Sequence, residues 1–144
     1  MVEDRITDGT RIAQLLSSEL DGREDGGLEY LAVTNADRDV EPTADGARAY
    51  DVTMTRAVDT DAGESDDDDT TLLAQVFVQP DRARVEFTAG QDGAAEAADE
   101  SGLRARPKAT KPPRTLVFVE SGAEVKRVTD VVQVVVRHER TGVE

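Results

Sequence analysis

The sequence predicts an α+β domain, with a mainly antiparallel sheet of about five strands and two or three helices packed on one face. Two observations predict this class. Residues 72–88 contain two alternating runs joined by a Pro-Asp turn, which is typical of a β-hairpin. Residues 7–22 and 121–138 instead carry apolar residues at helical spacing. The expected order is α-β-β-β-β-α-β-α, in a single domain over residues 1–144.

The first predicted element is an amphipathic helix over Thr7–Gly22. Thr7 is the expected N-cap, and Gly22 can end the helix in a left-handed conformation. One side of this helix gathers the apolar residues Ile12, Ala13, Leu15, Leu16 and Leu20. Two strands are expected next, over Leu28–Asn35 and Arg48–Arg56.

The central hairpin has two different runs. The first run has apolar residues on both faces, with Leu73 and Phe77 opposite Ala74, Val76 and Val78, which predicts a strand inside the sheet. In the second run, Ala83, Val85 and Phe87 share one face. The other face carries Arg82, Arg84 and Glu86, which we expect to be exposed to water.

The segment Gln91–Gly102 is predicted to form a short helix. Asp92 is the expected cap, and Gly102 is the expected stop. Leu103 then follows as the apolar contact that usually accompanies such a stop.

The last two elements are a strand and a helix. Thr115–Glu120 is a short apolar run, predicted to be buried on both faces and to join the sheet through a right-handed crossover. Ser121 and Glu124 have capping-box spacing and open a helix to about His138. Its apolar side is formed by Val125, Val128, Val131, Val132, Val135 and Val136.

The composition indicates an acidic protein with a lean core. Leu, Ile, Val and Phe make up 32 of the 144 residues, about 22%, just above the roughly 20% below which disorder is expected. The formal charge is −14, and lysine is scarce. Molar salt screens the self-repulsion of such a chain, and the composition resembles that of cytoplasmic proteins of salt-accumulating haloarchaea. The N-terminus lacks a signal peptide and no apolar run could span a bilayer, so we expect a cytoplasmic protein.

Residues 57–70 interrupt the strand pattern with a dense acidic run. A calcium loop beginning at Asp59 fails, because Gly63 and Glu64 stand at its fifth and sixth positions. We therefore expect a disordered, solvated loop.

The sequence contains no recognisable catalytic constellation. There is no cysteine, and the single histidine, His138, falls on the polar side of the last predicted helix. No serine stands in a GxSxG context, and neither a P-loop nor a GxGxxG motif is present. We predict no catalytic residue, no metal site and no cofactor.

One segment departs from the acidic background. Residues 104–114 contain three prolines and no acid, which favours an extended, polyproline-like path. The basic residues can bind an anion such as a phosphate backbone, or they can neutralise the acidic surface of the same domain. The segment lacks aromatic residues, which argues against sequence-specific binding of single-stranded RNA. The candidate binding residues are Arg104, Arg106, Lys108, Lys111 and Arg114, extended by Arg82 and Arg84.

Three stretches carry a resemblance to a family. RITDGTRIAQLLSSEL, QVFVQPDRARVEF and RPKATKPPRTLVFVESGAEVKR resemble a small uncharacterised haloarchaeal family with a domain of unknown function. The resemblance implies an archaeal cytoplasmic protein and supplies no activity. A clear fold pattern without catalytic residues then predicts a non-enzymatic binding or adaptor domain, with a protein partner or a second copy of itself and no membrane contact. The alternative is an accessory nucleic-acid-binding protein that uses residues 104–114.

Overall fold

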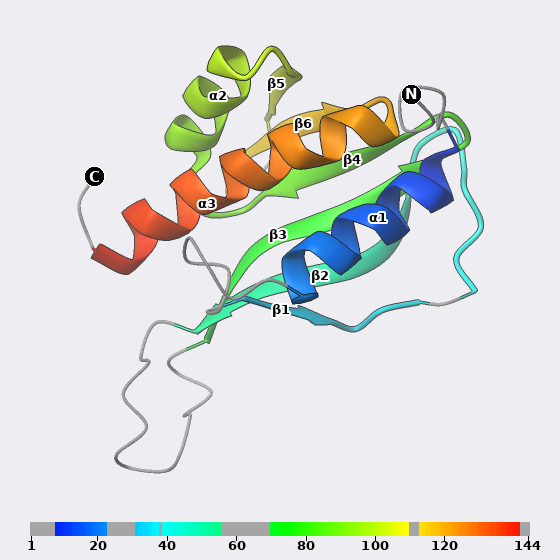
Figure 1. Ribbon diagram of the computed structural model, residues 1–144, viewed down its shortest axis with the longest axis horizontal. Coiled ribbons are helices and arrows are strands. Elements are labelled where there is room, and N and C mark those ends of the chain that lie inside the picture. Colours follow the sequence, from blue (N-terminus) through cyan, green and yellow to red (C-terminus); the bar gives the residue numbers. More distant parts are fainter. Residues whose placement is uncertain (1–7, 23–30, 38, 56–69, 110–112, 142–144) are drawn as a thin grey trace, which may run out of the picture.

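The computed structural model describes residues 8–22, 31–37, 39–55, 70–109 and 113–141. Within them, six strands form one antiparallel sheet in the order β1-β2-β3-β4-β6-β5 (Figure 1). The class is α+β as predicted, with six strands rather than about five. The strands are β1 Leu31–Thr34, β2 Ala47–Thr55, β3 Thr70–Gln79, β4 Arg82–Phe87, β5 Arg104–Lys108 and β6 Arg114–Val119. The helices are α1 Gly9–Gly22, α2 Gln91–Glu100, the short 3-10 helix η4 Gly122–Glu124, and α3 Val125–Thr141.

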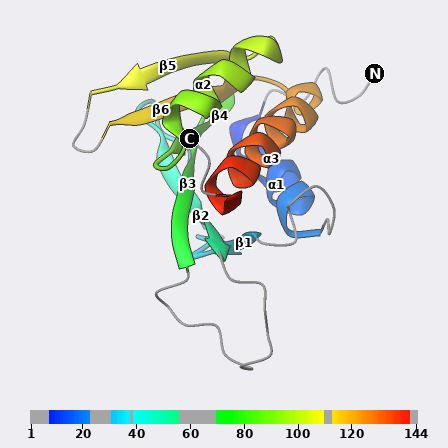
Figure 2. The ribbon, with the colours of Figure 1, turned by 90° about the vertical axis from the view of Figure 1, so that its left-hand side faces the viewer.

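The helices lie on one face of the sheet and leave the other face open (Figure 2). The predicted apolar side of α3 is buried against the sheet and the neighbouring helices, as are Ile12 and Leu16 of α1. Tyr50 on β2 ties α1 to the sheet, because its hydroxyl donates to the carbonyl oxygen of Ala13 at 2.8 Å. Burial raises the pKa of this phenol far above its ordinary value. The core is thus one layer between helices and sheet.

The two predicted helix caps have different outcomes. The Asp8 carboxylate accepts the backbone N–H of Arg11 at 3.1 Å and so caps the start of α1, while the predicted cap, Thr7, lies outside the described residues. The predicted cap of α2 is wrong. The cap position of α2 is Gly90, with φ of 62°, and Asp92 lies inside the first turn. The predicted end of α2 is confirmed: Gly102 has a positive φ and the buried Leu103 donates its N–H to Ala98.

The segment predicted as polyproline-like contains β5, the one strand that was not predicted from the sequence. Residues 104–108 pair with β6, because β6 offers unpaired backbone groups on that side. Pro107 is tolerated there since β5 is an edge strand. The chain does cross over between β4 and β6, which are neighbours in the sheet but are separated in the chain by α2 and β5. Because β6 runs antiparallel to both β4 and β5, the expected right-handed rule, which concerns parallel strands, does not apply to it.

Some predictions lie outside the described residues. These are Thr7, the start of the strand predicted at residue 28, Arg56, Lys111 and nearly all of the acidic segment, residues 57–69.

Candidate functional site

The open face of the sheet carries an alternating row of arginine and phenylalanine. Residues paired directly across antiparallel strands point to the same face. Arg48 pairs with Phe77, Phe77 with Arg84, Arg84 with Phe118, and Phe118 with Arg104. We call this row the ladder: Arg48, Phe77, Arg84, Phe118 and Arg104. It crosses five strands, which at about 4.8 Å per strand spans roughly 19 Å.

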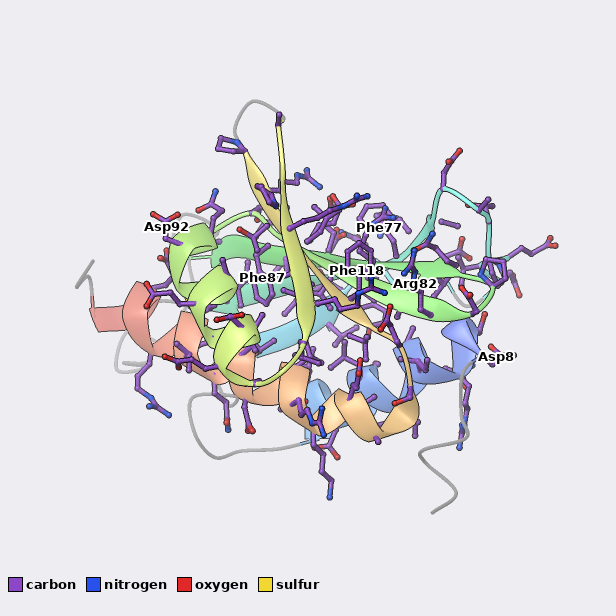
Figure 3. The ribbon with its side chains drawn as sticks, turned by 90° about the horizontal axis from the view of Figure 1, so that it is seen from above. Asp8, Phe77, Arg82, Phe87, Asp92 and Phe118 are labelled. Carbon is purple, nitrogen blue, oxygen red and sulfur yellow. The ribbon has the colours of Figure 1, made fainter. Side chains whose placement is uncertain are left out.

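Guanidinium groups stack on both aromatic rings. The guanidinium carbon of Arg84 lies 4.8 Å from the ring centre of Phe77. Phe118 is flanked by Arg82 at 4.7 Å and by Arg106 at 5.6 Å. Phe77, Phe118 and Arg82 lie close together on the side of the sheet away from α1 and α3 (Figure 3). These cation–π contacts explain why Phe118 is buried on a face without helices.

Two arginines, Arg84 and Arg114, are held near the centre of this face by a shared carboxylate, and we call them the inner arginines. Glu86 lies between them with 0% exposure, accepting Arg84 Nε at 2.8 Å and Arg114 Nη1 at 3.0 Å. Arg84 also donates to the carbonyl oxygen of Asp45. The adjoining Gly46 has φ of 95°, and a Cβ there would lie 2.9 Å from the Arg84 guanidinium. The expectation that Arg84 and Glu86 are exposed to water is therefore wrong, because Glu86 has no exposed surface and the Arg84 side chain is only 11% exposed.

Four further arginines form the periphery, and we call Arg48, Arg82, Arg104 and Arg106 the outer arginines. Glu120, which follows β6 directly, uses one oxygen, Oε2, to accept both Arg82 Nη1 and Arg104 Nη1 at 3.2 Å. The Arg104 side chain is nonetheless 74% exposed. Arg106 is exposed as well, with its guanidinium on the Phe118 ring. The outer arginines thus present donors to solvent.

A polar network extends the site to β1. Asp51 on β2 accepts Asn35 Nδ2 and Gln75 Nε2, each at 2.9 Å, and pairs with Arg48 at 3.3 Å. Partial burial alone would raise the pKa of Asp51, but the two amide donors and the Arg48 charge outweigh it and hold the pKa below its ordinary value. Gln75 also accepts Arg114 Nη1 at 3.0 Å, which links this acid to the inner arginines.

The structure brings most of the predicted binding residues to this one face. Arg82, Arg84, Arg104, Arg106 and Arg114 all lie on it. The backbone of Lys108 pairs with Arg114, but its side chain is outside the described residues, as is all of Lys111. Sequence reasoning missed the other members, Arg48, Phe77 and Phe118. Phe77 could have been found, because the hairpin alternation already puts it on the face opposite the core.

The electrostatics of this face are opposite to those of the whole chain. Its described side chains include the four outer and two inner arginines against three acids, Asp51, Glu86 and Glu120. The chain as a whole carries −14. An anion is therefore attracted to this face although the protein repels it elsewhere.

A hollow of about 520 Å³ lies on the other side of the sheet, between α1, the loop after β1, and β2. Its described lining contains one carboxylate, Asp37. The residues of this hollow are Thr10, Ala13, Gln14, Ser17, Ser18, Val33, Ala36, Asp37, Val40, Ala49, Tyr50 and Val78. This set offers no nucleophile with an adjacent base.

Within the part of the chain that the structure describes, no three His, Cys, Asp or Glu side chains lie close enough together to hold a metal ion. None of the described helices combines the length and apolar character that a membrane crossing requires.

A family model described as a family of unknown function, DUF7993, matches residues 1–144. The chain belongs to this family. No curated protein and no solved structure matches this DUF7993 chain. The DUF7993 assignment agrees with the predicted resemblance to a domain of unknown function, while the haloarchaeal origin stays a prediction.

Proposed function

We propose that this protein is a non-enzymatic binding domain that holds single-stranded nucleic acid on the open face of its sheet. The observation that carries the proposal is the ladder, in which arginines and phenylalanines alternate across five strands. The proposal keeps the cytoplasmic, high-salt setting that the composition predicts.

The first argument is charge. Phosphate groups bind to guanidinium donors, and the outer arginines lie on β2, β4 and β5 rather than at one point. A polyanion can therefore contact several of them at once, whereas a single small anion would use one or two. This distribution supports an extended ligand.

The second argument is the aromatic rings. Proteins that bind single strands combine a cationic track with aromatic side chains on which bases stack. Phe77 and Phe118 supply these rings beside the basic segment, which lacks aromatics of its own. A duplex keeps its bases stacked inside, so the rings favour an unpaired strand. An acidic protein partner would match the charges but would leave the rings without a specific role.

A paired-variant experiment tests the proposal. Arg104→Gln with Arg106→Gln removes two outer arginines, while Lys126→Gln with Arg127→Gln removes the same charge from exposed positions on α3. Binding of labelled oligo(U) and oligo(dT) is measured by fluorescence anisotropy. We expect the first variant to weaken binding by at least about tenfold, since each lost phosphate contact is worth about 1 kcal/mol. The second variant should change it by less than about twofold.

Three outcomes would contradict the proposal. The wild-type protein could fail to bind either oligonucleotide, or the two variants could weaken binding equally. The third is that oligoglutamate binds as tightly as the oligonucleotides, which would favour the protein partner predicted from the sequence. Self-association measured by light scattering in the same buffers would favour the homodimer.

A further inference from the structure

We propose that Arg82, Arg104 and Phe118 form the first nucleotide subsite, and that Glu120 occupies it until a ligand phosphate displaces the carboxylate. This inference rests on the proposed function and deepens it by locating one phosphate and one base. The observation behind it is that a single oxygen of Glu120 accepts hydrogen bonds from both Arg82 and Arg104.

The geometry around Glu120 resembles that of a bound phosphate. Its Oε2 accepts from guanidinium groups on β4 and β5, two strands that are separated by β6. A phosphate oxygen at the same place would satisfy the same two donors with a comparable charge. The carboxylate therefore marks a position where arginines from two strands donate to the same anionic oxygen.

The ring of Phe118 lies beside this position. Arg82 contacts both Phe118 and Glu120. Its guanidinium carbon lies 4.7 Å from the Phe118 ring centre, and its Nη1 lies 3.2 Å from Glu120 Oε2. Arg106 covers the same ring at 5.6 Å and is exposed. A base can take the place of Arg106 on the ring, and the freed guanidinium then faces the next phosphate.

Two of the acids on this face, Glu86 and Glu120, differ in how easily they can be displaced. Glu86 is fully buried and accepts Arg84 at 2.8 Å, within the range of strong charge-assisted hydrogen bonds. Glu120 is 31% exposed, and both of its arginine bonds are 3.2 Å long. Exposed ion pairs of this kind contribute little, so Glu120 yields to a competing anion while Glu86 stays in place.

The test compares Glu120→Gln with a matched control, Asp130→Asn. Both remove one negative charge, but Asp130 is an exposed residue of α3 on the helix side of the sheet. Binding of labelled oligo(U) is measured by anisotropy at one potassium chloride concentration. Glu120→Gln should tighten binding by about 2- to 30-fold, the worth of two exposed ion pairs, and Asp130→Asn by much less. Adding Arg104→Gln to Glu120→Gln should remove most of the gain.

The outcomes separate this inference from the proposed function. If wild-type protein binds but Glu120→Gln leaves affinity unchanged or weaker, the subsite assignment is overturned and the proposed function stands. Equal tightening by Asp130→Asn would overturn it too, because the effect would then reflect net charge alone. If neither wild type nor Glu120→Gln binds, both proposals fail. Circular dichroism of each variant establishes that it is folded.

Discussion

Replacing Glu86 should destabilise the protein far more than replacing Glu120, although both are acids on the open face. Glu86 has no exposed surface and receives charge-assisted hydrogen bonds from both inner arginines at 2.8 and 3.0 Å. In Glu86→Ala, Arg84, whose side chain is 11% exposed in the wild type, would lose this carboxylate partner. Breaking a buried pair in this way costs about 3–5 kcal/mol, because a desolvated charge loses its partner. Glu120→Ala breaks exposed pairs and should cost no more than about 1–2 kcal/mol.

Urea unfolding followed by circular dichroism measures this difference. Urea is preferred to guanidinium chloride, since the latter is a salt and would screen the interactions under test. With an m-value of about 2 kcal/mol/M, a loss of about 4 kcal/mol lowers the midpoint by about 2 M. Glu86→Gln should fall between wild type and Glu86→Ala, because its amide oxygen still accepts one guanidinium N–H. Equal midpoints for Glu86→Ala and Glu120→Ala would refute the idea that the inner arginines depend on a buried carboxylate.

Two other predictions concern salt and pH. If the four outer arginines contact phosphate, a plot of the logarithm of oligo(U) affinity against the logarithm of salt concentration should have a slope of about −3. Arg106→Gln should make this slope shallower by about 0.7. A slope near zero in an anisotropy titration would exclude phosphate contacts. Asp51 has a lowered folded-state pKa, so its stabilisation is present above its unfolded pKa of about 4 and is lost as pH falls through the folded value. The difference in unfolding free energy between wild type and Asp51→Asn should therefore shrink below about pH 4 in urea titrations, and a constant difference would count against the network.

Local periodicity was sufficient to predict the helices and the hairpin. The valines of α3 recur at helical spacing despite their preference for strands, and the structure buries all six of those predicted to face the core. The alternation over β4 correctly put Ala83, Val85 and Phe87 on the core side. Each of these predictions depends on residues close in sequence.

The errors about exposure and strand pairing arose where the interacting residues are distant in sequence. Glu86 looks exposed in the hairpin pattern, and only Arg114, 28 residues later, completes its burial. The strand at 104–108 exists because β6 lies beside it, which composition cannot reveal. The candidate site was predicted only in part for the same reason. Most of its basic residues form a run in the sequence, but the rings of Phe77 and Phe118 that lie among them come from β3 and β6.

The proposed function requires an acidic protein to bind a polyanion, which is favoured when its charges are separated in space, as they are in this fold. The helix layer carries exposed acids, among them Asp92, Glu96, Asp99 and Glu100 on α2, while the opposite face of the sheet carries the ladder. At molar salt the Debye length is about 3 Å, so repulsion between the helix layer and a ligand across the sheet is screened. Salt screens stacking on the rings far less than it screens this long-range repulsion, because stacking acts at contact distance. The same holds for hydrogen bonds from guanidinium groups that already lie on the rings. As the salt concentration rises, a larger share of the binding free energy should therefore come from stacking on Phe77 and Phe118 than from net charge. A surface that alternates arginine with phenylalanine should then keep its affinity in high salt better than a purely cationic surface.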